Sequence, residues 1–568
     1  FIHLGLYASS GGYWPPENGK KYPQHYSEWI RAWANVSEPE YGNLTKPLFT
    51  PEKGCTEQWA KVAKEAGMKY GVLTTKQHDG YTLFNAKTPY SVSNTITGST
   101  NISPKGRDLV DEYSKSFRQQ NLKVGYYYSL IDWQHPHAYP LIRGWALASN
   151  PDHNKYVDYM HSHIKQLFSD YGKSDIIWVD FSFPNYQGKT WKTRSLLDTL
   201  HKLQPHAITN NRFWNGLENS YGDYFTPEKY IPARGYPGRS FEVCHTMNQS
   251  FGYSRHDNQW RSSKETIHML IDIVSKGGNL LLNVGPDEKG RIPQECVDRL
   301  QEVGQWLRVN GEAIYATSAS PFRKLSANLR CTQKRLKNGD SKLYLHILDW
   351  PANGQIQLPG LESEILSVSF LKSHKKVDIK KKENSVVLLL PKTVITAKAS
   401  VLTLTLKGAV NINELMSFPQ QASDRSITLT ANDAELSGPS LRLESARSGQ
   451  QFANLGYWTD KKAIASFPCN VHTPVKKASS ATKTGRYNVY ISYAVAKGSG
   501  GDFLFTAGND QKIKVTIKST GSWFTYKRLK IGEIVLTKSG ATEFKVKAVN
   551  IHGEALMNLK SLELIPVD

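Results

Sequence analysis

The sequence predicts an α/β fold, a (β/α)8-like (TIM-type) barrel, followed by two antiparallel β-sandwich domains. Short apolar, β-branched segments alternate with helical patterns from residue 1 to about residue 318. After that point the pattern changes to short alternating runs separated by turn residues. The chain has 568 residues, which is too long for one core, so we expect about two to four domains.

The predicted barrel occupies residues 1–318. Its expected strands are 1–7, 69–75, 122–130, 175–180, 207–212, 223–226, 241–247 and 280–285. Its expected helices are 57–67, 108–121, 154–170, 196–203, 266–276 and 294–309. Repeated strand–helix units indicate a parallel sheet with right-handed crossovers. A doubly wound sheet is the alternative, but the Gly-rich motif that is typical after the first strand of such a sheet is absent.

The remainder predicts two sandwiches joined by a polar connector. Residues 319–408 form the smaller one, with expected strands 342–348, 365–371, 385–390 and 400–406. Residues 409–425 are the connector. Residues 426–568 form the larger one, with expected strands 487–494, 501–506, 512–517, 527–536 and 542–549. Alternating short strands with Gly/Ser turns are typical of such folds.

Composition is that of a soluble globular protein, with 39% hydrophobic and 21% charged residues. Aromatic residues reach 11%, which suits stacking on sugar rings, although large cores use aromatics too. No stretch approaches the roughly 18 apolar residues of a membrane span. The chain begins at Phe1 within a strand pattern and shows no signal peptide. We expect that an upstream segment has been removed and that the protein is secreted or periplasmic.

The formal net charge is +21, which favours polyanionic partners. The lysines are scattered and form no nucleic-acid module, so we expect a sulfated or uronic polysaccharide rather than nucleic acid. The five cysteines have neither zinc-motif nor disulfide-framework spacing. The pairs His135-x-His137 and His161-x-His163 come nearest to a metal pattern, but the second pair lies in an expected helix, where this spacing splits their directions. We therefore expect no metal and no cofactor.

Polar side chains fall where the expected strands end: His3, His78, Tyr128, Asp180, Arg212 and Glu228. The clearest case is Asp175 to Ser182, a buried apolar strand that ends in Asp180. Each residue alone has an ordinary explanation, since Asp180 could cap the next segment and Arg212 could be an ion-pair partner. Catalytic side chains collect at the carboxyl ends of barrel strands, so their convergence predicts a pocket suited to a monosaccharide.

The chemistry that fits is glycoside hydrolysis, which needs one charged and one protonated carboxyl group. Asp180 suits the nucleophile, and Arg212 nearby would hold a carboxylate ionised. The residues alone leave the acid/base open among Glu218, Glu228 and Glu242. Aromatic rings that could pack on the sugar are Trp29, Trp133, Trp178 and Trp214, of which Trp178 also suits the core.

Six stretches carry a resemblance to a known family: Phe1–Gly5, Tyr26–Trp29, Leu73–Gly80, Gly125–Ser129, Ile177–Asp180 and Gly278–Pro286. Because of these stretches, residues 1–405 resemble the α-L-fucosidases of glycoside hydrolase family 29. The resemblance implies release of terminal α-L-fucose with retention, through a covalent glycosyl-aspartate. It places the nucleophile on Asp180 and the acid/base on Glu228, with Glu242 as the second choice. It carries the sugar-binding positions over to His3, Glu28, Trp29, His78, Tyr128, Trp178 and Arg212. Gln77 and Trp214 complete the expected substrate-binding residues.

One departure bears on specificity. Many family members have two adjacent histidines where this chain has Gln77-His78. Glutamine can donate and accept a hydrogen bond but carries no charge. An apolar methyl pocket rejects an added hydroxyl only modestly, so an α-L-galactosidase is the alternative activity.

The last sandwich resembles a carbohydrate-binding module of the jelly-roll kind. Its stretches are Gly485–Tyr493, Thr520–Tyr526 and Leu559–Leu564. Trp458 or Trp523 could stack on sugar, or lie in the core. The expected partner is a fucose-containing glycan, including sulfated forms. A non-catalytic sugar-binding protein on a decayed enzyme fold is the remaining alternative, and Asp180 argues against it.

Overall fold

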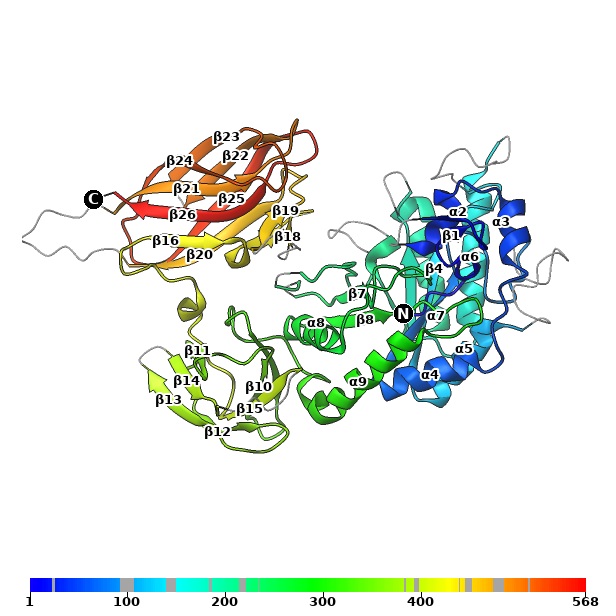
Figure 1. The fold of residues 1–568 in the computed structure, drawn as a ribbon, viewed down its shortest axis with the longest axis horizontal. Helices are drawn as coiled ribbons and strands as arrows, with labels where there is room; N and C mark the ends of the chain where they lie inside the picture. Colours follow the sequence, from blue (N-terminus) through cyan, green and yellow to red (C-terminus); the bar gives the residue numbers. More distant parts are fainter. Residues whose placement is uncertain are drawn as a thin grey trace, which may run out of the picture. The chain divides into compact units, whose positions relative to one another are not determined.

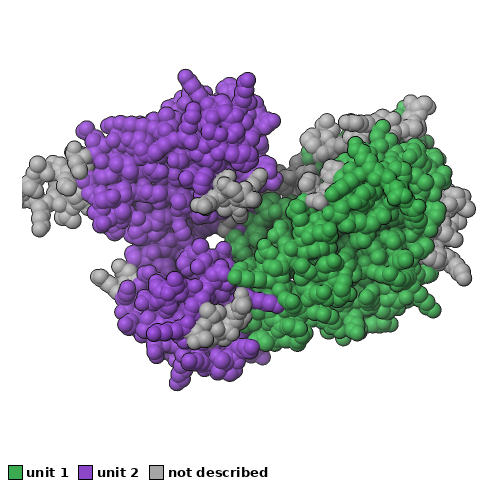
Figure 2. All heavy atoms as spheres, viewed as in Figure 1, with its two compact units in different colours: residues 1–231, 238–317 green, residues 232–237, 318–568 purple. Residues whose placement is uncertain are grey.

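The computed structural model describes all residues except 23–25, 92–106, 139–149, 183–185, 214–220, 233, 237, 383–384, 393–397, 439, 445–451, 473–484, 509–510 and 568. The chain divides into two compact units (Figure 2). Unit 1 contains residues 1–231 and 238–317, and unit 2 contains residues 232–237 and 318–568. Each unit is described by itself below.

Unit 1 is built on parallel strands (Figure 1). Four of them pair in the order β3 (Tyr70–Lys76), β4 (Lys123–Ser129), β5 (Ile176–Asp180) and β6 (Ile208–Thr209). A second parallel pair joins β7 (Glu242–Thr246) to β8 (Asn279–Asn283). The strands β3 to β5 are buried along almost their whole length, which explains their near-continuous apolar sequences.

Single parallel bridges extend these pairings. Ile2 bridges both Leu73 in β3 and Val284 just after β8, so the first residues lie between the two sheets. The expected strand 1–7 is limited to this bridge, because the Leu4 amide donates to the Thr74 side chain at 3.0 Å and α1 (Tyr7–Ser10) follows. The parallel α/β organisation agrees with expectation, while closure into an eight-stranded barrel stays a prediction.

Six longer helices accompany these strands in the described part of unit 1: α4 (Cys55–Glu65), α5 (Leu109–Gln119), α6 (His153–Ser169), α7 (Thr193–Leu203), α8 (Ser263–Ser275) and α9 (Gln294–Asn310). Three of them, α5, α6 and α8, have a side-chain cap at their start. Asp108 accepts from the amides of Val110 and Asp111 at the start of α5. Ser262 and Glu265 form a capping box at the start of α8.

The loops of unit 1 carry short elements. They are β1 (Tyr13–Trp14), β2 (Lys20–Lys21), η1 (Ser27–Trp29), α2 (Ile30–Trp33), α3 (Glu38–Thr45), η3 (Gly188–Trp191), η4 (Asn211–Phe213) and η5 (Gly311–Ala313). Three of them, η1, α2 and η4, contribute residues to the cavity described below.

Unit 2 begins with two small antiparallel sheets. One has the order β12 (Ile365–Phe370), β15 (Ser400–Leu406), β10 (Ser341–Ile347), β9 (Leu329–Arg335). The other has the order β11 (Gln355–Pro359), β14 (Ser385–Leu389), β13 (Asp378–Lys382). Leu343 and Leu345 of the first and Val386 and Leu388 of the second share one apolar cluster. The two sheets therefore enclose a core, as in a sandwich.

A larger pair of sheets follows the short helices η6 (Glu414–Ser417) and η7 (Ala431–Asp433). One sheet has the order β18 (Arg442–Glu444), β19 (Asn454–Gly456), β26 (Asn558–Pro566), β21 (Arg486–Ala494), β24 (Lys527–Val535), and β16 (Ile427–Thr430) also pairs with β26. The other has the order β17 (Glu435–Ser437), β20 (Ile464–Val471), β25 (Gly540–His552), β22 (Gly500–Ala507), β23 (Gln511–Ile517).

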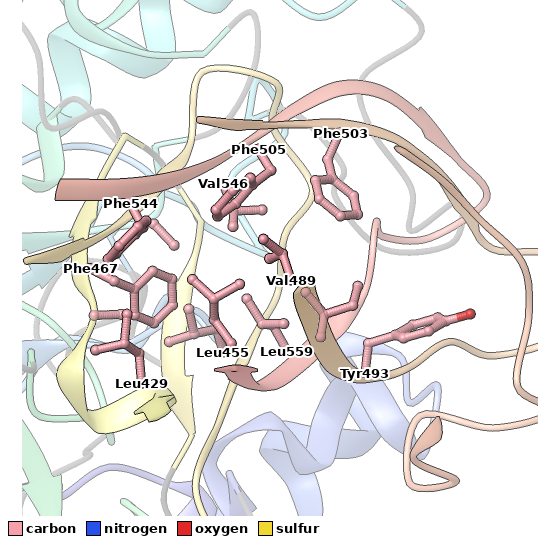
Figure 3. Close-up of a cluster of buried hydrophobic side chains, with 14 of the residues drawn as sticks. Leu429, Leu455, Phe467, Val489, Tyr493, Phe503, Phe505, Phe544, Val546 and Leu559 are labelled. Carbon is pink, nitrogen blue, oxygen red and sulfur yellow. The ribbon is translucent and has the colours of Figure 1, made fainter. Parts of the chain in front are cut away.

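The core of this second sandwich is a single cluster of buried side chains (Figure 3). Val489 and Leu559 come from one sheet, and Phe467, Phe505 and Phe544 come from the other. Burial alternates along β21, as the period of two in its sequence predicts. This cluster is separate from the cluster of the smaller sandwich, as two sandwich domains would require. The domain boundaries at residues 408 and 426 remain predictions.

Three further observations concern the whole described chain. None of its helices combines the length and apolar character that a membrane span requires. All five cysteines are unpaired and buried. No group of three or more His, Cys, Asp or Glu residues within the described ranges is arranged to hold a metal ion.

Candidate active site

A cavity of about 540 Å³ opens in unit 1. Nine residues that the sequence predicts for the site line it: His3, Glu28, Trp29, Gln77, His78, Trp178, Asp180, Arg212 and Glu228. Further lining residues that the sequence analysis did not select include Tyr26, Trp33, Tyr127, Phe181 and Ser182. The cavity is therefore rich in aromatic rings and contains three carboxyl groups, one guanidinium and two imidazoles.

Asp180 is the last residue of β5, and three donors hold its carboxylate. Oδ1 accepts from Arg212 Nη1 at 2.8 Å and from the backbone amide of Phe181 at 3.0 Å. Oδ2 accepts from the hydroxyl of Tyr127 at 3.1 Å. Charged acceptors form the stronger hydrogen bonds, so this carboxylate is fixed in orientation.

Arg212 joins the two carboxyl groups of the site. Its Nη1 binds Asp180, and its Nη2 donates to Glu228 Oε2 at 3.0 Å. Its Nε donates to the hydroxyl of Thr226 at 3.0 Å, and the guanidinium lies 4.4 Å from the ring centre of Trp178. Burial alone would lower the pKa of Arg212, but the charges of Asp180 and Glu228 raise it above its usual value. The guanidinium is therefore a permanent cation between two acids.

Glu228 has a second donor besides Arg212. The hydroxyl of Tyr26 donates to Glu228 Oε1 at 3.0 Å. The Nζ of Lys229 lies over the ring of Tyr26, 4.1 Å from the ring centre. The Glu228 side chain keeps 28% of its surface exposed, in contrast to most of the site. Glycoside hydrolysis uses a pair of carboxyl groups, and Asp180 and Glu228 both line this cavity.

Tyr127, rather than the predicted Tyr128, belongs to this cavity. Tyr128 does not line it, and its hydroxyl instead lies 3.0 Å from Nδ1 of the buried His163. The reason is the alternation of side chains along β4. Tyr127 pairs with Trp178 and Ser129 pairs with Asp180, so these residues share one face and Tyr128 lies on the other. The structure therefore places Tyr127 at the cavity where the sequence predicts Tyr128.

Both histidines of the cavity are neutral, because burial lowers their pKa well below 6.5. The amide of Asn283 donates to the Phe251 carbonyl at 2.7 Å, so its oxygen faces His3 Nδ1 at 2.6 Å. Nδ1 of His3 must then carry the proton. The hydroxyl of Ser129 donates to Ile131, so its oxygen accepts from His78 Nδ1 at 2.8 Å. In both rings Nε2 is left as an acceptor.

Glu28 and Gln77 complete the polar lining. Glu28 Oε2 accepts from the amide of Gly252 at 2.9 Å, and burial raises the pKa of this carboxyl to about 7. Gln77 Oε1 lies 2.7 Å from the hydroxyl of Tyr127. That hydroxyl has one proton, and the charged Asp180 binds it more strongly than an amide oxygen does. Both residues line the same cavity as Asp180 and Glu228.

A comparison with known protein families identifies the family of this chain. A sequence model described as Alpha-L-fucosidase matches residues 1–312. The chain belongs to the α-L-fucosidase family. The resemblance that the sequence motifs indicate is therefore confirmed, and the protein is an α-L-fucosidase-type glycoside hydrolase of family 29.

Three known α-L-fucosidases illustrate the extent of the match. The enzyme of Dictyostelium discoideum is 30% identical over 63% of this chain and 77% of its own length. The structure from Vibrio sp. strain EJY3 is 25% identical, covers 100% of this chain and 96% of its own, and has a TM-score of 0.72. A trapped covalent intermediate from Bacteroides thetaiotaomicron is 25% identical over 72% of this chain and 93% of its own, with a TM-score of 0.62.

One predicted position, Glu242, does not line the cavity. Glu242, the second choice for the acid/base, is buried and accepts from Trp178 Nε1 at 3.0 Å and from the Tyr70 hydroxyl at 2.5 Å. Burial raises its pKa, and it is absent from the cavity lining. Trp214, together with the candidate Glu218, lies outside the described residues.

Backbone conformation marks two residues that the motifs did not select for chemistry. Tyr26 and Phe181 both have positive φ, of 67° and 72°. Bulky residues adopt this region only at a cost in free energy, and such strain clusters at functional sites. Phe181 follows Asp180 directly, and Tyr26 binds Glu228, so the strained positions adjoin the two carboxyls. Sequence patterns carry no signal for such conformations.

Proposed function

We propose that the protein is an exo-acting, retaining α-L-fucosidase in which Asp180 is the nucleophile and Glu228 is the acid/base. The observation that supports this most directly is the shared guanidinium of Arg212, which binds both carboxyl groups within a cavity of about 540 Å³. That volume lies within the ordinary range of small-molecule pockets, about 300–1,000 Å³. The parallel bridges of Ile2 and of residues 224–225 further support an eight-stranded barrel carrying the site at its carboxyl edge.

In the first step a carboxylate oxygen of Asp180 attacks the anomeric carbon of the bound α-L-fucoside. The bond to the leaving oxygen breaks, and that oxygen takes the proton of Glu228. In the second step water attacks the same carbon, Glu228 takes a proton from the water, and Asp180 leaves as a carboxylate. Two inversions give net retention. The trapped intermediate of the Bacteroides thetaiotaomicron relative supports this sequence of steps.

The contacts of Glu228 imply a rearrangement when substrate binds. Both of its oxygens accept hydrogen bonds, from Tyr26 and from Arg212. A carboxyl that donates a proton must turn one oxygen toward the leaving group. We infer that the sugar, on entering the cavity, displaces one of these contacts. The partial exposure of Glu228 leaves room for this movement.

Recognition of the sugar would combine acceptors with aromatic walls. His3 and His78 each offer an unprotonated Nε2 to a sugar hydroxyl. The apolar lining, which includes Trp29, Phe181 and Phe251, suits the methyl group that distinguishes fucose from galactose. We therefore propose fucose as the preferred sugar and L-galactose as the competing one, because such pockets exclude an extra hydroxyl only modestly.

Two finer proposals concern the natural substrate. The formal charge of +21 supports a sulfated fucose-containing glycan. The last sandwich is proposed to bind carbohydrate, although Trp458 has no exposed surface and so belongs to the core. Trp523 is only partly buried and donates weakly to Glu554 at 3.4 Å, so it is the better candidate for contact with sugar.

The test is rescue of alanine variants by azide. In Asp180→Ala, azide should take the place of the carboxylate and give the inverted β-L-fucosyl azide from an aryl α-L-fucoside. In Glu228→Ala, azide should attack the glycosyl-enzyme and give the retained α-L-fucosyl azide. Product configuration by NMR thus distinguishes the two roles. Glu242→Ala is the matched control and should yield no azide product.

An α-L-fucosyl azide from the Asp180 variant would contradict Asp180 as the nucleophile. An azide product from the Glu242 variant would contradict Glu228 as the acid/base. Full wild-type turnover by the Asp180 variant would exclude the proposed mechanism. The hydrolysis rates of the wild-type protein on an aryl α-L-fucoside and an aryl α-L-galactoside, measured side by side, show which sugar is preferred. A protein that binds fucose but cleaves neither would be a non-catalytic binder.

A further inference from the structure

A second cleft of unit 1, of about 580 Å³, lies beside the start of α7. It is lined by four cations, Lys189, Lys192, Arg194 and Lys202, against one carboxylate, Asp198. All five side chains are exposed. Concave clusters of one sign focus the electrostatic field and attract ions of the opposite sign. The cleft therefore favours an anionic group.

These cations are largely free to bind a ligand. Lys192 lies 3.4 Å from Asp158, in an exposed pair of the kind that contributes little. Arg194 stacks over Tyr221, which also lines the cleft, at 5.6 Å from the ring centre. Across the described ranges, Lys189 and Lys202 make no ion pair. Their charges are consequently not neutralised within the protein.

Thr193 gives an independent indication of a ligand. It is the first residue of α7, lines the cleft and is 1% exposed, yet its hydroxyl has no hydrogen-bond partner. Buried hydroxyls are nearly always bonded, so one without a partner requires an explanation. The preceding Lys192 has a φ of 49° and provides no side-chain cap to the helix. Uncapped first-turn amides bind anions, and an oxyanion could accept from them and from Thr193.

The cleft is connected to the active-site cavity through one buried side chain. Trp191 precedes Lys192 and donates from Nε1 to the hydroxyl of Ser182 at 3.1 Å. Ser182 lines the active-site cavity, two residues after Asp180. A helix that follows a strand starts at the carboxyl edge of the sheet, so the cleft opens on the same edge as Asp180. A sugar chain that leaves the cavity past Ser182 would run toward the cleft.

We propose that this cleft binds a sulfate ester on an extended glycan whose terminal fucose occupies the active-site cavity. The proposal rests on the proposed function and specifies its substrate class. Lys189, Lys202 and Arg194 would neutralise the sulfate, while Thr193 and the first-turn amides of α7 would donate to its oxygens. An exposed contact of this kind weakens as salt rises.

The test compares two variants that each remove three positive charges from the full chain. The site variant is Lys189→Gln/Arg194→Gln/Lys202→Gln. The control is Lys380→Gln/Lys381→Gln/Lys382→Gln, on the fully exposed strand β13. The probe is a sulfated α-L-fucose tetrasaccharide and its desulfated form. We expect the kcat/KM ratio of sulfated to desulfated substrate to fall about tenfold in the site variant and to stay at the wild-type value in the control.

Equal falls in both variants would attribute the effect to net charge and overturn the proposal, as would an unchanged ratio in the site variant. Calorimetry of the tetrasaccharides with the full chain carrying Asp180→Asn, with and without the site substitutions, gives the same comparison without turnover. If the wild-type protein binds the sulfated form through the cleft but cleaves no fucoside, the proposed function fails while the cleft stands. Binding of inorganic sulfate without preference for the sulfated tetrasaccharide would show an isolated anion site and overturn the glycan proposal.

Discussion

The hydroxyl of Tyr127 lies 3.1 Å from Oδ2 of Asp180, while the next residue, Tyr128, binds His163 on the opposite face of β4. Burial raises the pKa of Tyr127 well above 10, so this hydroxyl remains a donor throughout the working pH range. In the proposed mechanism this donor holds the attacking carboxylate, so Tyr127 and Tyr128 can be compared as a residue inside the site and a neighbour outside it.

Tyr127→Phe should therefore lower kcat/KM for an aryl fucoside by about 10- to 100-fold, because one donor to the reacting carboxylate is lost. Tyr128→Phe removes only the contact with His163 and should cost about 1 kcal/mol of stability, with less than a threefold change in rate. Steady-state kinetics and urea unfolding measure both effects. Equal rate losses in the two variants would contradict the assignment of Tyr127 to the site.

Glu228→Gln removes the proposed proton donor, so its effect should depend on the leaving group. An activated aryl fucoside, which needs little protonation, should lose about tenfold in kcat/KM, and a natural disaccharide at least about 10³-fold. A Brønsted plot over aryl fucosides of different leaving-group pKa measures this. A flat dependence would remove Glu228 from the role.

Glu242→Gln is a matched control for that substitution, with a different outcome. Glu242 accepts from both Tyr70 and Trp178, whereas in the variant the amide oxygen can accept from only one of them and the amide N–H leaves the proton of the Tyr70 hydroxyl without its acceptor. We expect a loss of about 1–3 kcal/mol in the free energy of unfolding, measured in urea, with the same fractional rate change for every leaving group. A dependence on the leaving group in this variant would indicate that Glu242, and not Glu228, is the acid/base.

Glu28 should contribute a pH-dependent term to stability. Its pKa is raised from 4.5 to about 7 by burial, so between these values the folded state binds more protons than the unfolded state. Its contribution is fully present below pH 4.5 and is lost as pH rises through about 7. Relative to Glu28→Gln, the wild-type protein should thus lose stability between pH 5 and pH 8, by at most ~1.4 kcal/mol per pH unit. A constant difference in urea unfolding would contradict this.

Lys76 and Asp132 form a buried ion pair behind the cavity, 3.3 Å apart and 0% and 1% exposed. Lys76 Nζ also donates to the Ile131 carbonyl at 2.9 Å. Lys76→Met would leave a buried carboxylate without its cation, at a cost of about 3–5 kcal/mol. Lys61→Met, at an exposed pair with Glu65, should change stability by less than about 0.5 kcal/mol. Similar midpoints in denaturant for both variants would refute the prediction.

The strand ends were predictable from local sequence, because apolar β-branched segments followed by a polar residue mark the carboxyl edge of a sheet. Asp180 does end β5, whereas Arg212, expected at the end of strand 207–212, lies in η4 beyond β6. The choice between Tyr127 and Tyr128 depends on the register of β4 against β5, a tertiary property that consecutive tyrosines do not reveal. Tyr26 was missed because its contact with Glu228 joins positions 202 residues apart.

The choice between Glu228 and Glu242 was open for a related reason. Both follow apolar or aromatic residues near expected strands, and both are close to Trp178 or Arg212 in space. Only the fold shows that one carboxyl enters the cavity and the other binds its wall. The resemblance to family motifs supplied the order of preference, which composition and periodicity could not.

The neutral rings of His3 and His78 have a consequence for ligand design. Because each Nε2 can only accept, the two sugar hydroxyls facing them must act as donors. A deoxyfluoro fucose keeps the size and the dipole at such a position but has no proton to give. Replacement of either of those two hydroxyls by fluorine should therefore weaken binding of a fucose analogue as strongly as removal of the oxygen.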